Sequence, residues 1–181
     1  DKADVDGVLR DPITGVAEAY SVNYLKNEWT PIGSAVKDDI EFLNREARGQ
    51  WNVTSRSRDK RLWTVMVDRV NEPVTFYLYD RMAKKLAKLF ATRPELEGKQ
   101  LASMHPVEIK ARDGLTLVAY LSLPPGTDKD GNGRPDHPLP MVLNVHGGPW
   151  ARDEFGYHSE YQWLANRGYA VLAVNYRGSS G

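Results

Sequence analysis

Hydrophobic and polar residues follow different patterns in the two halves of the chain. In the first hundred residues, short runs rich in β-branched and aromatic residues alternate with polar turns, as in strands joined by hairpins. After residue 105, two almost continuous apolar runs at 138–148 and 170–178 enclose a stretch with apolar residues at helical spacing. This change predicts an all-β first part and an α/β second part.

The first part contains three β-rich runs at short, regular spacing, at 50–57, 61–70 and 74–82. Such a meander is typical of a β-propeller blade, which normally has about four strands. Shorter strands are expected upstream, within 15–25 and 27–33. Because a single blade cannot bury both of its faces, the pattern implies neighbouring blades.

A short helix is predicted within the first part, over residues 34–49. Apolar residues recur there at helical spacing, Ser34 can cap the beginning, and Gly49 ends the pattern. Downstream, a polar stretch containing Pro and Gly, near 91–103, is the candidate linker between the two parts.

The second part begins with two strands about the turn Arg112–Gly114. The apolar run 138–148 indicates a strand covered on both faces, and it stops at a Gly pair. A helix over 160–169 and a second apolar strand from residue 170 follow. A strand, helix and strand of these lengths predict a crossover unit in a parallel sheet.

Composition narrows the class of protein. The 181 residues carry 24 basic and 24 acidic side chains, so the balanced charge does not favour a polyanion partner. The chain has no Cys, which excludes disulfides, thiolate metal sites and a Cys nucleophile. Apolar runs are too short for a membrane-spanning helix, which needs roughly 18 residues. We therefore expect a soluble chain with neither a nucleic acid nor a membrane as partner.

The first residues, "DKADVDG", include no initiating Met and lack the basic-then-apolar order of a signal peptide. We expect residue 1 to be a processed, cleaved or otherwise defined end. The compartment stays open between cytoplasm and periplasm.

Three motifs in the second part occur in a recognisable order: "RDG" at 112–114, "HGGPW" at 146–150, and "WLANRGYAVLAVNYRGSSG" at 163–181. With them, the chain resembles the prolyl oligopeptidase family of serine peptidases, above all its acylaminoacyl-peptidase and dipeptidyl-peptidase-like branches. In that family a β-propeller precedes an α/β-hydrolase domain. The resemblance implies the end of a propeller and linker at 1–103, and the beginning of an incomplete α/β-hydrolase domain at 104–181.

The resemblance also implies an oxyanion-hole donor in the His-Gly-Gly-Pro turn, on the backbone N–H of Gly148, with Gly147 beside it. Glycine suits this place because no side chain blocks the approach to the N–H. The alternative is a glycine turn that merely closes a strand. His146 could act as a general base, but it is expected to order the turn through its ring nitrogens.

A nucleophile is expected in a Gly-x-Ser-x-Gly turn, and the chain contains no complete copy. "GSSG" at 178–181 is a near match that would make Ser180 the nucleophile. In the family, however, this loop precedes the nucleophile, so we expect the Ser, the acid and the catalytic His to lie beyond residue 181. His158 could line a substrate pocket, but an exposed or helix-capping role is favoured.

Two polar segments invite a binding interpretation. The segment Asp128–Asp136 places oxygen ligands in the order of the first half of a calcium loop. Leu139, however, stands where the loop requires a bidentate Glu. An acidic hairpin is therefore favoured, and a weak calcium site stays open. The basic run 56–61 beside Trp63 could bind phosphate, but alternation on a strand places Arg56 and Arg58 at a solvated hairpin.

The sequence thus predicts a fragment of a serine-type peptidase for short peptides, inactive by itself and without a metal or cofactor. Its expected partners are a peptide substrate and the rest of the same polypeptide; a homo-oligomer is allowed, and the cleavage preference stays open. The alternatives are a noncatalytic hydrolase-like binding module and an esterase of the same fold. A Gly-x-Ser-x-Gly turn downstream would favour the peptidase.

Overall fold

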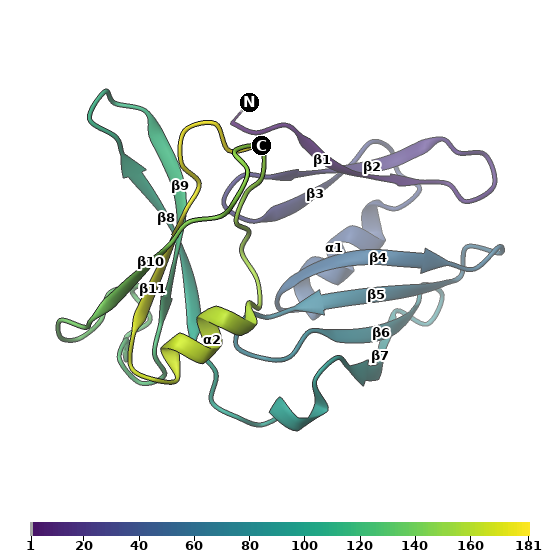
Figure 1. Ribbon diagram of the computed structural model, residues 1–181. Helices are drawn as coiled ribbons and strands as arrows, with labels where there is room; N and C mark the ends of the chain where they lie inside the picture. The colour runs from purple at the N-terminus through teal and green to yellow at the C-terminus, as the bar shows by residue number, and fades with distance from the viewer. Residues whose placement is uncertain (1) are drawn as a thin grey trace.

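The computed structural model describes residues 2–181, in which three β-sheets, two α-helices and one 3-10 helix are arranged around two apolar cores (Figure 1). The elements are β1 (Val5–Arg10), β2 (Ala17–Asn23), β3 (Asn27–Pro31), α1 (Lys37–Glu46), β4 (Gln50–Arg56), β5 (Leu62–Asp68), β6 (Thr75–Asp80), β7 (Lys85–Ala91), η1 (Pro94–Leu96), β8 (Ser103–Lys110), β9 (Thr116–Leu123), β10 (Met141–Asn144), α2 (Ser159–Ala165) and β11 (Ala170–Val174).

The first half folds into two antiparallel sheets, β1-β2-β3 and β4-β5-β6-β7. The three predicted runs at 50–57, 61–70 and 74–82 are confirmed as β4, β5 and β6. Every second residue of β5 is buried, including Trp63 and Val65, because one face of this strand meets the core. This core also takes side chains from β1, β2 and α1, so the two sheets and the helix form one packed body (Figure 1).

Strand β7 lies in a stretch for which the sequence indicated no strand. Its pattern is obscured because most of its residues, including Leu89 and Phe90, are exposed at the edge of the sheet. The Phe90 ring nevertheless stacks on Phe76 of β6, with ring centroids 4.9 Å apart. Contact with β6 therefore stabilises β7 as a strand, although the sequence of β7 shows no regular alternation.

The predicted helix in the first half is confirmed as α1. Ile40 and Leu43 are buried on its inner face, and Val36 and Ala47 continue the same apolar stripe at its two ends. The expected cap is wrong: Val36 occupies the N-cap position without a side-chain cap, and Ser34 contributes only its carbonyl, which accepts a hydrogen bond from Lys37 N at 3.4 Å.

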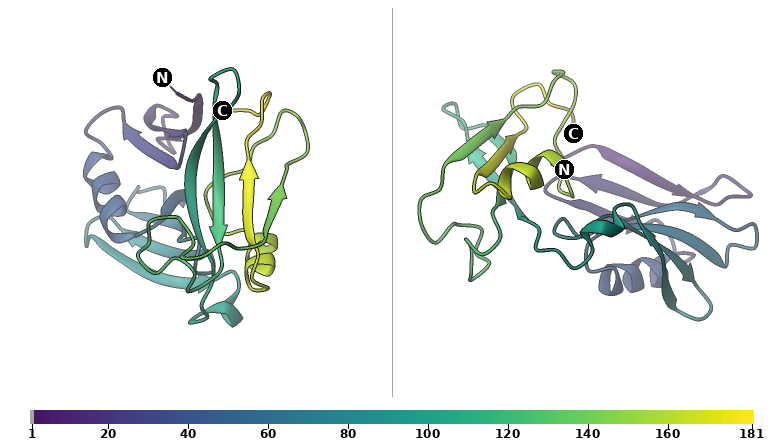
Figure 2. Two further views of the ribbon diagram at one scale, coloured as in Figure 1. Left: turned by 90° about the vertical axis from the view of Figure 1, so that its left-hand side faces the viewer. Right: turned by 60° about the horizontal axis from the view of Figure 1, so that its bottom comes forward.

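The second half forms a four-stranded sheet in the order β10-β11-β9-β8. The predicted crossover is confirmed, because β10 and β11 pair in parallel and α2 lies between them in sequence. Helix α2 lies against this sheet (Figure 2). Its Tyr161 joins Tyr120 and Val171 in the second core. Neither α1 nor α2, the α-helices of residues 2–181, has the length and apolar character needed to cross a membrane.

The prediction that the run 138–148 is a strand covered on both faces is wrong for this structure. Only Met141–Asn144 is strand, since Pro138 and Pro140 lack the N–H that a ladder requires. In residues 2–181 β10 is the edge of its sheet, and Met141 and Leu143 are 56% and 58% exposed. Strand β11, with neighbours on both sides, is buried as expected.

Candidate active site

The two loops that leave β10 and β11 lie at one edge of the second sheet. The strands are parallel and in register, with Leu143 beside Leu172 and Asn144 beside Ala173, so both carboxyl ends reach the same edge. The first loop begins with the His-Gly-Gly-Pro turn, and the second contains residues 175–181. In open α/β sheets this edge is where ligands bind.

Gly148 occupies a conformation that favours glycine. Its φ is +149°, and a Cβ placed there would lie 2.9 Å from the Trp150 nitrogen. Gly147 is less restricted, because a Cβ at that position meets no atom within 4 Å. The bond from Gly148 to Pro149 is cis. Of the two positions, only Gly148 therefore has a backbone conformation that requires glycine.

The backbone donors of the glycine pair are open to a ligand. Gly147 and Gly148 are both exposed, and among residues 2–181 neither N–H donates a hydrogen bond. Unpaired, accessible N–H groups at the end of a strand can receive an oxygen that carries negative charge. The role of the turn as an oxyanion-hole donor stays a prediction.

His146 faces the neighbouring loop. Its Nε2 lies 2.8 Å from the Ser179 Oγ and its Nδ1 lies 2.8 Å from the Gly147 carbonyl oxygen. Both ring nitrogens are therefore occupied by contacts within the two loops, as expected for a residue that orders the turn.

A partly buried polar network behind the turn joins the ends of both strands. Asn144 donates to the Tyr161 hydroxyl at 3.1 Å, and that hydroxyl donates to Asp153 at 2.9 Å. Asn175, directly after β11, accepts the Asp153 N–H at 2.7 Å and donates to its carbonyl at 3.1 Å. Burial, followed by the Asp153 carboxylate, raises the pKa of Tyr161, so this hydroxyl stays a donor.

Sequence reasoning missed this network, although a signal was present. An Asn is the last residue of β10, in "VLN" before Val145, and another directly follows β11, in "AVN" before Tyr176. An amide at the end of a buried run offers both a donor and an acceptor where the ladder stops. The matching positions could have indicated a shared polar cluster.

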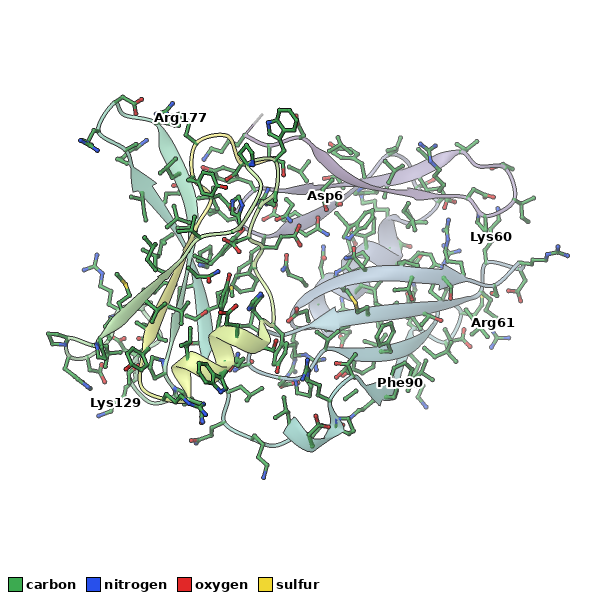
Figure 3. All side chains as sticks on the ribbon, viewed as in Figure 1. Asp6, Lys60, Arg61, Phe90, Lys129 and Arg177 are labelled. Atoms are coloured by element: carbon green, nitrogen blue, oxygen red, sulfur yellow. The ribbon has the colours of Figure 1, made fainter. Side chains whose placement is uncertain are left out.

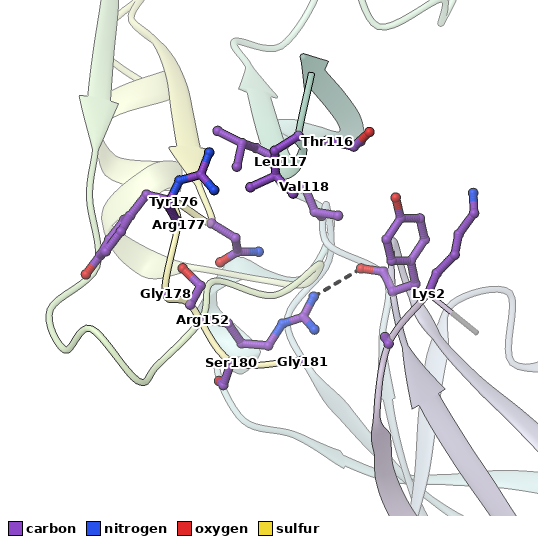
Figure 4. A pocket seen from close by; sticks show the side chains of 15 residues that line it. Lys2, Thr116, Leu117, Val118, Arg152, Tyr176, Arg177, Gly178, Ser180 and Gly181 are labelled. Carbon is purple, nitrogen blue, oxygen red and sulfur yellow. Dashed lines mark hydrogen bonds between the residues drawn. The ribbon is translucent and has the colours of Figure 1, made fainter. Parts of the chain in front are cut away.

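A pocket of about 230 Å³ lies where the second sheet meets the first half of the chain (Figure 4). Arg152 crosses it, donating to the Asn23 carbonyl at 2.6 Å and the Tyr24 carbonyl at 3.0 Å. The dashed line in Figure 4 marks such a bond from Arg152 toward the first half. The segment that follows the turn is thus fixed to the β2–β3 connection.

Ser180 and His158 lie outside any catalytic arrangement in the described residues. Ser180 is exposed, and its backbone N–H donates to the Ala151 carbonyl at 3.0 Å. His158 is exposed at the N-cap position of α2, caps no backbone group with its ring, and stacks on Tyr161 with centroids 3.9 Å apart. The exposed position expected for His158 is confirmed.

Side-chain oxygens of Asp128, Asp130 and Asn132 accept hydrogen bonds from the 128–136 loop itself. Asp128 accepts the Asn132 N–H at 3.0 Å and the Gly133 N–H at 2.9 Å, and it contacts His105 Nε2 at 3.2 Å. Although burial opposes ionisation, the Gly133 N–H and the other donors lower the pKa of Asp128. Within residues 2–181, no group of three or more His, Asp or Glu side chains is arranged to hold a metal ion.

The basic hairpin is paired with acidic groups. Arg56 is not solvated as predicted: its side chain is 4% exposed and donates to Glu18 at 2.7 Å. Lys60 pairs with Asp11, and Arg61 donates to Asp80 at 2.6 Å. Lys60 and Arg61 lie at the hairpin end farthest from the second sheet, whereas Arg177 lies beside that sheet (Figure 3). Of Arg56 and Arg58, which were both expected at a solvated hairpin, only Arg58 is exposed.

Comparison with known proteins places the chain among peptidases. It is 51% identical over 180 residues to "Dipeptidyl aminopeptidase BIII" of Pseudoxanthomonas mexicana and 36% identical over 195 aligned residues to "Dipeptidyl peptidase family member 6" of Caenorhabditis elegans. Both alignments include 99% of the chain and 26% of the relative, so the chain spans about a quarter of the length of these relatives. No family model matches the chain.

The fold agrees with these sequence relationships. The acylaminoacyl peptidase of Pyrococcus horikoshii superposes on the whole chain, over 26% of its own length, with a TM-score of 0.61 and 18% sequence identity. The homologues are dipeptidyl peptidases along the whole chain, and the structural neighbours are acylaminoacyl and prolyl peptidases. The chain therefore belongs to the prolyl oligopeptidase family of peptidases and corresponds to a fragment of such a protein.

Proposed function

We propose that the chain is part of a serine-type peptidase that hydrolyses short peptides, with its Ser-His-Asp triad outside residues 1–181. The observation that carries the proposal is the exposed pair of unbonded N–H groups at Gly147 and Gly148, at the carboxyl end of a parallel strand. The similarity of the whole chain to dipeptidyl peptidases supports a peptide substrate.

In this proposal residues 1–103 end a β-propeller, and residues 104–181 begin an α/β-hydrolase domain. The four-stranded antiparallel meander β4–β7 has the strand number of a propeller blade. The parallel pair β10 and β11, the crossing helix α2 and the glycine turn after β10 suit the beginning of a hydrolase sheet. A propeller beside the active site would limit entry to short or unfolded peptides.

The proposed reaction begins when the Ser hydroxyl attacks the scissile carbonyl and the His accepts its proton. The carbonyl oxygen then becomes an oxyanion, which accepts a hydrogen bond from the Gly148 N–H. One such donor lowers the barrier by about 3 kcal/mol. The names of the two relatives favour release of dipeptides, and this preference is part of the proposal.

Hydrolysis by the complete polypeptide tests the proposal. We expect release of dipeptides from fluorogenic peptides, hydrolysis of peptide bonds as well as of matched esters, and stoichiometric labelling of one Ser by a fluorophosphonate. Purified residues 1–181 should not react with the same probe. Labelling of this piece at Ser180 would contradict the proposed position of the nucleophile, and hydrolysis of esters without hydrolysis of peptides would favour an esterase. Binding of peptides without hydrolysis or labelling would favour a noncatalytic module.

A further inference from the structure

The His-Gly-Gly-Pro turn needs support from outside itself. An oxyanion donor accelerates a reaction only if its N–H is already held in place when the charge develops. In the described residues, the N–H groups of Gly147 and Gly148 make no hydrogen bonds that could hold them. The support must therefore come through the side chain or the carbonyl groups of the turn.

The contacts of His146 define the protonation of its neutral ring. The Gly147 carbonyl can only accept a hydrogen bond, so Nδ1, 2.8 Å away, carries the proton. Nε2 is then an acceptor, and the Ser179 hydroxyl at 2.8 Å must donate to it. By donating to Nε2, the Ser179 hydroxyl thus stabilises the tautomer that holds the Gly147 carbonyl, and this carbonyl belongs to the peptide group whose N–H is on Gly148.

A second contact acts on the same residue from the same loop. The Tyr176 hydroxyl donates to the His146 carbonyl at 3.1 Å, and the two rings stack with centroids 4.5 Å apart and planes inclined by 20°. The His146 carbonyl belongs to the peptide group whose N–H is on Gly147. The two side chains of the second loop therefore orient both peptide groups of the glycine pair.

The second loop is itself anchored. Ser179 N donates to the Tyr176 carbonyl at 2.9 Å, which closes the loop. Ser180 N donates to the Ala151 carbonyl at 3.0 Å, which ties the loop to the segment after the turn. A closed loop bonded at both sides of the turn can act as a rigid support.

We propose that Tyr176 and Ser179 are positioning residues for the oxyanion turn and that they act through His146. This inference rests on the proposed function of the turn. Neither side chain needs to touch the substrate. Their removal should weaken stabilisation of the transition state more than binding of the ground state, because the charge on oxygen appears only in the transition state.

Steady-state kinetics of the complete polypeptide on a fluorogenic dipeptide substrate tests the inference. Ser179→Ala and Tyr176→Phe should each lower kcat by about 10- to 100-fold, with KM changed by less than about threefold. Ser179→Thr keeps the hydroxyl and should recover most of kcat. Ser180→Ala is the matched control, since it removes a neighbouring hydroxyl that makes no hydrogen bond in residues 2–181, and it should resemble wild type.

Equal kcat for Ser179→Ala and Ser180→Ala would overturn the inference, and so would a change confined to KM. Fluorophosphonate labelling of Ser179 itself, in place of a downstream Ser, would assign it a direct catalytic role and also overturn the inference. Thermal unfolding of each variant separates loss of folding from loss of rate. If Ser179→Ala proves unstable, Tyr176→Phe still tests the inference, because it keeps the ring that stacks on His146.

A spectroscopic readout decides the inference independently of peptidase activity. In the complete polypeptide labelled with ¹⁵N-histidine and assigned with His146→Gln, Nδ1 of His146 should carry the proton in wild type and Ser180→Ala. Ser179→Ala should shift this signal toward a mixture of tautomers. An unchanged tautomer would overturn the inference. If wild type hydrolyses no peptide, the proposed function fails, while this measurement still decides the role of Ser179.

Discussion

Both carboxylate oxygens of Asp68, at the end of β5, accept the backbone N–H of Tyr157, at 3.0 and 2.8 Å. This contact joins the four-stranded sheet of the first half to the segment between the glycine turn and α2. Gly156 leaves room for it, because a Cβ at that position would lie 2.6 Å from the Asp68 Oδ2. The turn is therefore connected to the β4–β7 sheet through a side chain far away in sequence.

Asp68→Ala should destabilise the protein. Asp68 also accepts the Val70 N–H at 2.7 Å, so its loss leaves two backbone donors unpaired, at about 1–3 kcal/mol each. Asp68→Asn keeps one acceptor oxygen and should cost less. Urea unfolding monitored by Trp fluorescence measures both variants. An Ala variant as stable as the Asn variant would show that this contact does not stabilise the fold.

Arg152→Met should loosen the connection between the two halves while keeping much of the packing of the side chain. It removes the donors to the carbonyl groups of Asn23 and Tyr24, which precede Lys26 in the β2–β3 turn. If the contacts of Arg152 stabilise the junction by about 1–2 kcal/mol, their loss would raise the population in which the β2–β3 turn is detached by roughly 5- to 30-fold. Tryptic cleavage after Lys26 would rise by the same factor.

Arg112→Met is the control for this experiment, because Arg112 is exposed and makes no hydrogen bond or ion pair in residues 2–181. Mass spectrometry of the early cleavage products identifies the site. If Arg152→Met and Arg112→Met are cleaved after Lys26 at the same rate, the contacts of Arg152 do not limit opening of the junction.

The sequence was sufficient where burial on one face imposed a regular period. The alternation around Trp63 and Val65 and the helical stripe through Ile40 and Leu43 both predict the observed elements, because each buries one face in the same core. Strand β7 was not predicted, because its exposed edge position allows Lys88 and Phe90 to interrupt the period. A period is visible only where burial selects it.

The site was predicted only in part for a related reason. The glycine turn is local, and its pattern of residues is readable along the chain. The contacts of His146 with Tyr176 and Ser179 depend on β10 and β11 pairing in register, which brings together loops about thirty residues apart. Likewise, the apolar residues of β10 indicated a buried strand, but Leu143 lies exposed at the edge formed in residues 2–181.

Asp39→Asn should destabilise the first half, and the effect should depend on pH. Asp39 is buried and accepts from Arg81 at 2.6 Å, Lys84 at 2.8 Å and the Tyr79 hydroxyl at 2.8 Å. Burial alone would raise the pKa of Asp39, but the bonds from Arg81, Lys84 and Tyr79 outweigh it and lower the pKa below the ordinary 3.8. Removing the charge leaves two cations without their partner and should cost about 3 kcal/mol.

Because the pKa of Asp39 is lower in the folded state, its stabilising contribution is fully present above pH 3.8 and is lost as the pH falls through the folded pKa. The difference in unfolding free energy between wild type and Asp39→Asn should therefore be constant near neutral pH and shrink below pH 3.8. Urea unfolding over a pH series measures it. A difference that grows as the pH falls would contradict the assigned direction of the pKa.

Gly148→Ala should reduce catalysis by the complete polypeptide far more than Gly147→Ala. At Gly148 the φ of +149° disfavours any side chain, and the new Cβ would lie 2.9 Å from the Trp150 nitrogen, so the turn must shift its N–H groups. Loss of one oxyanion donor lowers kcat by about 100- to 1,000-fold. At Gly147 a Cβ meets no atom within 4 Å, so that peptide group can keep its orientation.

Peptide hydrolysis under steady-state conditions compares the two variants, and thermal unfolding verifies that each is folded. Gly148→Ala should lower kcat with little change in KM, since the oxyanion forms only in the transition state. Fluorophosphonate labelling should slow in parallel, because the phosphonyl oxygen occupies the same donors. Equal kcat values for the Ala variants at positions 147 and 148 would mean that the Gly148 N–H does not stabilise the oxyanion, and that the conformation of Gly148 serves only to close the turn after β10.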